Sequence, residues 1–260
     1  MTKPTASFNV ISAFFKSPYY YPGHPTWTIG TYDTLIFKSN SLNASSVMWD
    51  FGNRKTANTN TAGIIYDSAG IYNITLTALD RNGNKDTATM KIVVKERVIQ
   101  DLSIDKLNLN SFAPSQNGLP VFSKLDLWLV LKYSNSATDT ITNNGDVNAQ
   151  IMYKSPVFSN IDSSFHSSIN YTVPSGIKAT IKCPLYLPSV IPFQGGLGLF
   201  LNLYGKDDTG TYLLASSRWS GIGLSFTDLY GGNPNYSNTF GLQTYAAGST
   251  TTMQLNCRYQ

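Results

Sequence analysis

The chain has 260 residues, of which 42% are hydrophobic, 13% are aromatic and only 13% are charged. Charged residues make up about 25% of an average soluble protein, so the polar surface must come from Ser, Thr and Asn, as is typical of extracytoplasmic β-proteins. The net charge of +4 is scattered, and the absence of a basic run argues against a nucleic-acid-binding protein. The sequence has no apolar run of about 18 residues, so we expect no transmembrane segment.

Alternation of apolar and polar residues predicts the strands of the first part of the chain. They are expected at residues 8–15, 34–38, around Trp49, at 70–79 and at 86–95. Asn82-Gly83 is a strong hairpin signal and joins the last two of these strands. The stretches 16–30 and 53–62 are rich in turn and polar residues, and they are expected to be loops.

Trp49 is expected to be the central core side chain of this region. Val47 and Phe51 share its side of the strand, so the three side chains form one apolar face. The opposing strand is expected to begin at Gly70, whose backbone freedom suits a chain corner. Tyr72 follows at the corner and is expected to cap the core with its ring.

These motifs resemble the polycystic kidney disease (PKD) domain. The resemblance is carried by Trp-Asp-Phe-Gly at residues 49–52 and by Gly-Ile-Tyr-Asn-Ile-Thr-Leu-Thr at 70–77. Asn53-Arg54 replaces the second Asp-Gly of the family pattern, and Ile64 stands at its His position, which alters a turn and not the core. The resemblance covers residues 4–95 and implies an immunoglobulin-like sandwich that serves as a spacer or binding module.

Residues 3–8, Lys-Pro-Thr-Ala-Ser-Phe, resemble the start of the mature PKD module in surface lipoproteins of the Bacteroidetes type. This resemblance implies a signal peptide and a lipidated cysteine ahead of the present sequence. The protein is then expected at the cell surface or in the periplasm of a Gram-negative bacterium. The alternative is that Met1 is the native start of a cytoplasmic protein.

The charge cluster Lys95-Glu96-Arg97 marks the expected boundary between a first domain, residues 1–97, and a second domain, residues 98–260. Strands of the second domain are expected at residues 102–109, 125–133, 147–153, 169–173, 179–185, 197–204, 211–216, 221–226 and 251–259. Residues 125–133 are almost continuously apolar, which predicts a central strand. The chain is therefore expected to be all-β, with two antiparallel β-sandwiches in tandem.

Cys183 and Cys257 are the only cysteines. Each shares the parity of apolar neighbours on its expected strand, so both sulfurs are expected to face the core. They form either one disulfide or two buried free thiols. No Cys-x-x-Cys is present, which argues against a zinc knuckle or a thioredoxin-type site.

The second domain also resembles the calcium- and phospholipid-binding sandwich of protein kinase C. Residues 125–130 stand where that family has Asp-Pro-Tyr-Val, and Asp207-Asp208 stand where it has an Asp-x-Asp loop. The resemblance implies a calcium site at Asp126, Asp207 and Asp208, because hard cations need several oxygen ligands. The alternative is that Asp207 and Asp208 only form a polar hairpin turn.

Aromatic side chains beside planar polar groups are the expected features of a glycan site, because sugar C–H faces stack on rings. Two loop regions provide them, and long loops are more often functional than short ones. The candidate ligand-binding residues are Trp219, Tyr230, Asn233, Asn235 and Tyr236 in the second domain, and Tyr20 and Trp27 in the first. The alternative is that these rings pack beneath their own loops.

The sequence does not predict an enzyme. His24 and His166 are the only histidines, so no multi-histidine metal centre can form. Neither a nucleophile elbow nor a phosphate-binding loop is present. We therefore expect a non-catalytic surface lipoprotein that binds carbohydrate or mediates adhesion, with the PKD-like domain as a spacer. The alternatives are a structural or protein-interaction subunit of an envelope assembly and a calcium-dependent binding module.

Overall fold

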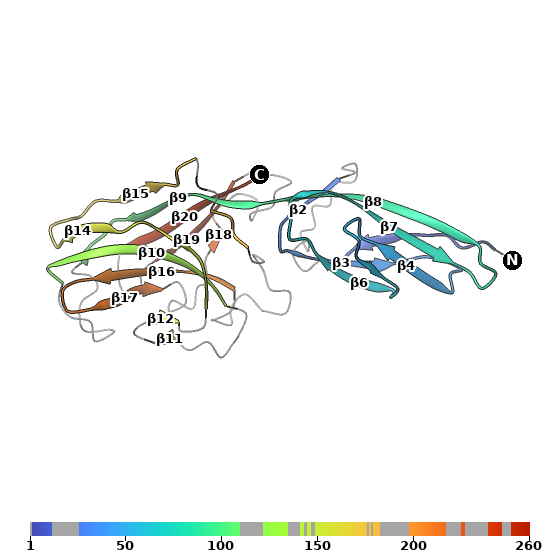
Figure 1. Cartoon of the computed structure of the whole chain (residues 1–260), viewed down its shortest axis with the longest axis horizontal. Coiled ribbons are helices and arrows are strands. Elements are labelled where there is room, and N and C mark those ends of the chain that lie inside the picture. The colour runs from blue at the N-terminus through green and yellow to red at the C-terminus, as the bar shows by residue number, and fades with distance from the viewer. Residues whose placement is uncertain are drawn as a thin grey trace. The chain divides into compact units, whose positions relative to one another are not determined.

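The computed structural model describes residues 2–11, 26–109, 122–134, 141–142, 145–146, 149–175, 177, 179–182, 198–216, 225–226, 239–245 and 251–260. Every regular element assigned in these residues is a β-strand, so the chain belongs to the all-β class (Figure 1). The chain divides into two compact units, Met1–Glu96 and Arg97–Gln260. The division lies within the charge cluster Lys95-Glu96-Arg97, one residue before the boundary expected after Arg97.

The first unit consists of two sheets. The smaller sheet has the order β1-β3-β6, with β1 at Phe8–Val10, β3 at Thr34–Ser39 and β6 at Thr61–Ile65. The larger has the order β2-β8-β7-β4-β5, with β2 at Thr26–Gly30, β8 at Lys85–Lys95, β7 at Gly70–Leu79, β4 at Ser46–Asp50 and β5 at Thr56–Ala57. Neighbouring strands are antiparallel except β2 and β8, which are parallel.

Trp49 is the central core side chain of the first unit, as predicted. It is 0% exposed, and its ring centroid lies 5.2 Å from that of Phe8, 5.7 Å from Phe37 and 6.2 Å from Phe51. The indole N–H donates a hydrogen bond to the Thr59 carbonyl oxygen at 2.8 Å. The ring therefore joins the two sheets without leaving a buried donor unpaired.

The predicted corner at Tyr72 is confirmed, and it contains a second tyrosine that the sequence did not single out. Tyr72 is half-buried and packs on Tyr66, with their ring centroids 4.2 Å apart. Tyr66 is almost fully buried, and its hydroxyl donates a hydrogen bond to the Phe51 carbonyl oxygen at 2.8 Å. The hydroxyl of Tyr72 donates to the Ser68 carbonyl oxygen at 3.0 Å and is exposed.

Some strand limits in the first unit differ from those expected. The first strand ends at Val10, and the remainder of the predicted stretch 8–15 beyond residue 11 lies outside the described residues. β5 and the start of β6 fall within the predicted loop 53–62, because short edge strands leave almost no alternating pattern. β2 lies in a stretch predicted to be loop.

The second unit is built around two five-stranded sheets. In one, the order is β13-β10-β16-β17 and β14 also pairs with β10: β13 at Gln150–Lys154, β10 at Lys124–Ser134, β16 at Gly198–Lys206, β17 at Thr211–Ser216 and β14 at Phe158–Asp162. In the other, the order is β15-β9-β20-β19-β18: β15 at Ile169–Thr172, β9 at Arg97–Asp105, β20 at Thr252–Tyr259, β19 at Thr239–Tyr245 and β18 at Ser225–Phe226. A separate pair joins β11, Ile141–Thr142, to β12, Gly145–Asp146.

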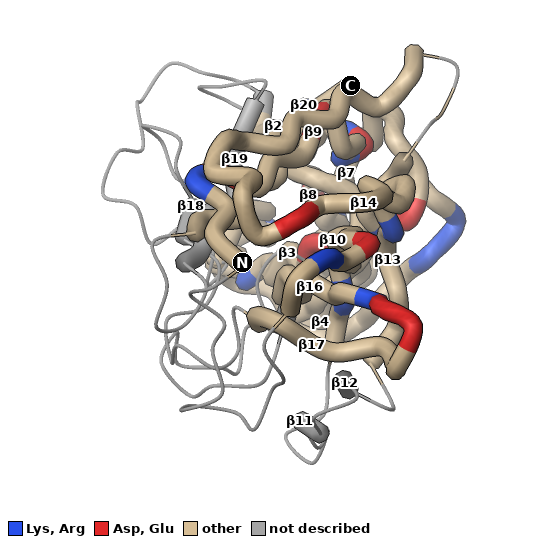
Figure 2. Tube along the Cα trace, turned by 90° about the vertical axis from the view of Figure 1, so that its left-hand side faces the viewer, with Lys and Arg blue, Asp and Glu red and all other residues tan. Residues whose placement is uncertain are grey.

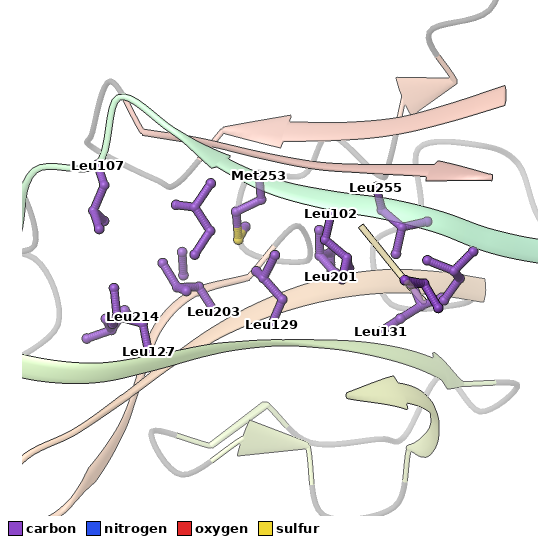
Figure 3. Close-up of a cluster of buried hydrophobic side chains, with 14 of the residues drawn as sticks. Leu102, Leu107, Leu127, Leu129, Leu131, Leu201, Leu203, Leu214, Met253 and Leu255 are labelled. Carbon is purple, nitrogen blue, oxygen red and sulfur yellow. The ribbon is translucent and has the colours of Figure 1, made fainter. Parts of the chain in front are cut away.

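Leucine and methionine side chains fill the space between these two sheets. Figure 3 shows Leu129 and Leu203 of one sheet pointing toward Leu102, Met253 and Leu255 of the other. All five are at most 2% exposed, and full burial of each such side chain stabilises the fold by about 1.5–3 kcal/mol. β10 has neighbours along both edges, which confirms the prediction that residues 125–133 form a central strand.

Cys257 lies in this core as predicted and carries a free thiol. It is 0% exposed, and burial raises the pKa of the thiol well above its usual range. Cys183 lies outside the described residues, as does part of the predicted strand 179–185, in which Thr180 forms an isolated bridge to Val98. The strands β11, β12, β14 and β19 were not predicted, and β9 covers Arg97–Asp105 where residues 102–109 were expected to form a strand.

Figure 2 shows the charged residues of the described part as short separate segments of both signs, without a continuous basic stretch. Within the described residues, no helix has the length and the apolar character needed to cross a bilayer.

Candidate ligand-binding site

Most of the predicted ligand-binding residues lie outside the described part of the chain. These are Trp219, Tyr230, Asn233, Asn235, Tyr236 and Tyr20. Trp27 is described: it lies on β2 opposite Ile92, is half-buried, and packs against the core of the first unit. Its ring therefore contributes to the core of the first unit, and its part in ligand binding stays a prediction.

Asp126 lies on β10 directly opposite Lys206 of β16. Its carboxylate oxygen Oδ1 accepts a hydrogen bond at 2.9 Å from the backbone N–H of Asn160. Asn160 has a positive φ of 64°, a backbone conformation for which a non-glycine residue needs local support. The carboxylate of Asp126 thus holds the middle of β14 beside β10.

Asp207 closes the turn between β16 and β17. Its Oδ1 accepts hydrogen bonds from the Thr209 hydroxyl at 2.7 Å and from the N–H groups of Thr209 at 2.8 Å and Gly210 at 2.9 Å. These bonds, that of the Thr209 hydroxyl first, hold the pKa of Asp207 below its usual range. The structure of Asp207 is therefore that of a polar hairpin turn.

Among the described residues, no three His, Cys, Asp or Glu side chains gather into a group that could hold a metal ion. The set Asp126, Asp207 and Asp208 is thus not assembled into a cluster of ligands. Calcium binding by this chain remains a prediction from the sequence.

A different aromatic group lies on the outer face of the sheet that contains β10. The register places Trp128 of β10 opposite Tyr204 of β16. Their rings are stacked, with centroids 5.8 Å apart and planes within 9° of each other. Alternate residues of a strand share a face, so Asp126 and Lys132 lie on the same side of β10 as Trp128.

Lysine side chains extend this pair into a row of four side chains. The Lys154 Nζ lies over the Trp128 ring, 5.0 Å from its centroid. The Lys132 Nζ lies over the Tyr204 ring at 5.7 Å. The group therefore consists of Lys154, Trp128, Tyr204 and Lys132, in which each ammonium lies over an aromatic ring.

The members of this row differ in how much of each reaches solvent. Tyr204 is 8% exposed and Lys132 is 7% exposed, and Tyr204 packs with Val130 and Leu213. Trp128 is half-buried and Lys154 is exposed. The indole of Trp128, bordered by Lys154, is therefore the part of the row that a ligand can reach, and we call these two residues the Trp128 platform.

The sequence did not reveal the Trp128 platform, because residues 125–133 look like a uniformly buried strand. The signal that was present is the polar or charged character of Asp126 and Lys132, which have the same parity as Trp128. This parity places the indole on the outer face. Its partners, Lys154 and Tyr204, come from strands far along the chain, so the sequence alone could not bring them together.

The outer face of the other sheet carries a row of polar side chains. The Asn256 Nδ2 donates to the Asp101 Oδ1 at 2.6 Å, and the Gln254 Nε2 donates to the Asn256 Oδ1 at 3.0 Å. All three side chains are half-buried. Because these groups already bond to one another, they have fewer free hydrogen-bonding sites to offer a ligand than an unpaired row would have.

The described carboxylates whose pKa values are shifted all accept hydrogen bonds within chain turns. Hydrogen bonds lower the pKa of Asp80, chiefly that from the Asn84 side chain, and the pKa of Asp162, chiefly that from the Ser164 hydroxyl. Asp207 behaves in the same way. A carboxylate held in its charged form by a turn lacks the raised pKa of a general acid.

Comparison with known proteins identifies the first unit. Residues 30–94 match the family model of the PKD domain. Comparison with curated proteins found no match. Among solved structures, the PKD1 domain of the Vibrio cholerae metalloprotease PrtV is 25% identical, with a TM-score of 0.27, over 36% of this chain and 98% of that one.

Two further solved structures are similar. The PKD1 domain of Vibrio anguillarum Epp is 22% identical over 36% of this chain and 94% of that one, with a TM-score of 0.27. A carbohydrate-binding module of the β-sandwich superfamily is 11% identical over 82% of this chain and 98% of that one, with a TM-score of 0.27. The family match covers Trp49, Phe51, Tyr66 and Tyr72, the residues that build the core and the corner, and residues 30–94 of this chain are therefore a PKD domain.

Proposed function

We propose that this chain is a non-catalytic binding protein of the bacterial cell surface, anchored by a lipid in its natural form, whose second unit recognises carbohydrate. The PKD domain supports the location, because PKD domains occur in extracellular and secreted bacterial proteins. The low share of charged residues, 13%, is in keeping with this location. In this proposal the PKD domain is a spacer that holds the second unit away from the membrane.

The Trp128 platform is the observation that carries the proposed recognition of carbohydrate. A half-buried indole offers a flat apolar surface on which the C–H face of a sugar ring can stack. The indole belongs to β10, a central strand, and it stacks on the Tyr204 ring with an angle of 9° between the two planes. A ligand surface on a rigid strand needs little ordering when the ligand binds, which favours affinity.

The predicted loop residues Trp219, Tyr230, Asn233, Asn235 and Tyr236 remain candidates for further contacts with the glycan. Nothing in the described residues places them, so their part in recognition stays a prediction. The Trp128 platform supports the proposed function without them.

Affinity electrophoresis of the purified chain through gels with embedded polysaccharides tests the proposal. We expect at least one polysaccharide to retard the chain, and we expect Trp128→Ala to abolish the retardation. Trp128→Tyr keeps an aromatic face and should keep part of it, while circular dichroism verifies that both variants fold. Retardation that survives in Trp128→Ala would exclude this surface.

A chain that no polysaccharide retards would favour the alternative role in an envelope assembly. That role predicts that a defined envelope protein binds the purified chain at a measurable stoichiometry. The two outcomes distinguish recognition of sugars from recognition of protein.

A further inference from the structure

Lys154 occupies the side of Trp128 that a ligand would use. Tyr204 approaches the indole from β16 and Lys154 approaches it from β13, and these strands flank β10 on opposite edges. The tyrosine ring at 5.8 Å and the lysine Nζ at 5.0 Å therefore lie on opposite sides of the indole. A ring that stacks on Trp128 must take the place of the Lys154 ammonium, because Tyr204 is almost buried.

The Lys154 ammonium is available for another partner. The side chain is exposed, and within the described residues its recorded interaction is the contact with the Trp128 ring. Asp126, which lies on the same face of β10, uses its Oδ1 to accept a hydrogen bond from the backbone N–H of Asn160. A contact between an exposed cation and a ring is weak, so the side chain can swing away at small cost.

We propose that the ligand of the Trp128 platform is an anionic sugar, a pyranose that carries a carboxylate or a sulfate. This inference rests on the proposed recognition of carbohydrate. The sugar ring stacks on the indole in place of the ammonium, and the displaced ammonium pairs with the anion at the edge of the ring. Lys154 thus changes from a cover of the indole into the partner of the ligand.

Charge complementarity favours the anionic sugar over a neutral one. When a neutral sugar ring displaces Lys154, the contact between the ammonium and the indole is lost, and the ligand offers the ammonium no charged partner. An anionic ring replaces that contact with a charge-assisted hydrogen bond, which is the stronger of the two in a partly desolvated site. The difference makes Lys154 a determinant of specificity.

A purely structural role for the same contact makes different predictions. If Lys154 only shields the indole and stabilises the sheet, its removal lowers stability slightly and uncovers Trp128 for every sugar alike. Selectivity for the charge of the ligand therefore separates the two roles.

The test compares ligands that differ only in charge. Polygalacturonate and its fully methyl-esterified form share one backbone and differ in the carboxylate, and dextran sulfate and dextran do the same for the sulfate. Lys154→Gln removes the ammonium. Lys124→Gln is the matched control, because Lys124 is exposed, shares the strand and face of Trp128, and lies four residues away, about 13 Å along β10. This distance exceeds the Debye length of about 8 Å at physiological ionic strength.

We expect the wild-type chain to bind at least one charged polymer more tightly than its neutral counterpart. Lys154→Gln should weaken the charged ligand about ten-fold or more, equivalent to about 1.4 kcal/mol, and should leave the neutral ligand unchanged or bound slightly more tightly. Lys124→Gln should change neither, and Lys154→Arg should restore the preference. The pair of polymers that shows the preference identifies the anionic group of the ligand as a carboxylate or a sulfate.

Equal binding of charged and neutral polymers that Trp128→Ala abolishes would overturn the anionic inference and leave carbohydrate recognition standing. Equal losses in Lys154→Gln and Lys124→Gln would show diffuse attraction and would also overturn it. Absence of binding to every polysaccharide would remove the proposed function, and this inference with it.

Discussion

Removal of the Tyr66 hydroxyl tests how the PKD domain closes its corner. The hydroxyl donates to the Phe51 carbonyl oxygen at 2.8 Å, and Tyr66 is 1% exposed. Tyr66→Phe keeps the ring but leaves a buried carbonyl without this donor, which costs about 1–3 kcal/mol. Tyr72→Phe removes a hydroxyl from the stacked neighbour, whose bond to Ser68 is exposed, so water can replace that partner.

Native-state hydrogen exchange of the whole chain, read by mass spectrometry on peptides from β7, measures both changes. A loss of 1–3 kcal/mol accelerates exchange through global unfolding of the domain by about 5- to 150-fold. Tyr66→Phe should show this acceleration, and Tyr72→Phe should stay within a few-fold of the wild type. Similar rates in the two variants would refute the assignment of the closing bond to Tyr66.

Three further predictions concern the backbone, a turn and the buried thiol. Gly52 has φ +72°, and a Cβ there would lie 2.8 Å from the Asn73 carbonyl oxygen, so Gly52→Ala should lower the free energy of unfolding by about 1–3 kcal/mol. A Cβ at Gly63 would lie 3.7 Å from the Leu35 carbonyl oxygen, so Gly63→Ala should not lower it, and urea titration compares the two variants. The pKa of Asp207 is below the usual 3.8, so its contribution is complete above that pH and is lost as the pH falls through the folded-state pKa. Asp207→Ala should therefore lower the urea midpoint of the second unit at pH 7 and lower it progressively less as the pH falls below 3.8 through the folded-state pKa. An effect that does not change with pH would contradict the role of the carboxylate. Burial raises the pKa of Cys257, so a thiol reagent should label this residue only as fast as the second unit unfolds, and rapid labelling without denaturant would show that the thiol is accessible.

The sequence predicts those parts of the fold that the residue pattern within a single strand or turn determines. Ile74, Leu76 and Ala78 alternate with polar residues, and all three face the core. Trp49 is surrounded by apolar residues of its own strand, so its place in the core followed directly. The turn at Asp207 was readable because its polar residues are consecutive.

Features that depend on pairing between distant strands could not be predicted in this way. The parallel pairing of β2 with β8 joins segments more than sixty residues apart, and no local pattern distinguishes it from a loop. The Trp128 platform has the same origin, since Lys154 and Tyr204 reach the indole only through the register of β10 with β13 and β16. A continuous apolar run hides which of its residues face outward, and only the pairing decides it.

A comparison of three variants decides whether the ligand site lies at Trp128 or in the loop of Tyr230 and Tyr236. Trp128→Ala, Tyr230→Ala and Tyr236→Ala are run beside the wild-type chain in affinity gels that contain the polysaccharide with the strongest retardation. We expect Trp128→Ala to abolish retardation while remaining folded, whatever the loop variants do. Full retardation of Trp128→Ala together with its loss in the loop variants would contradict it and place recognition in the loop.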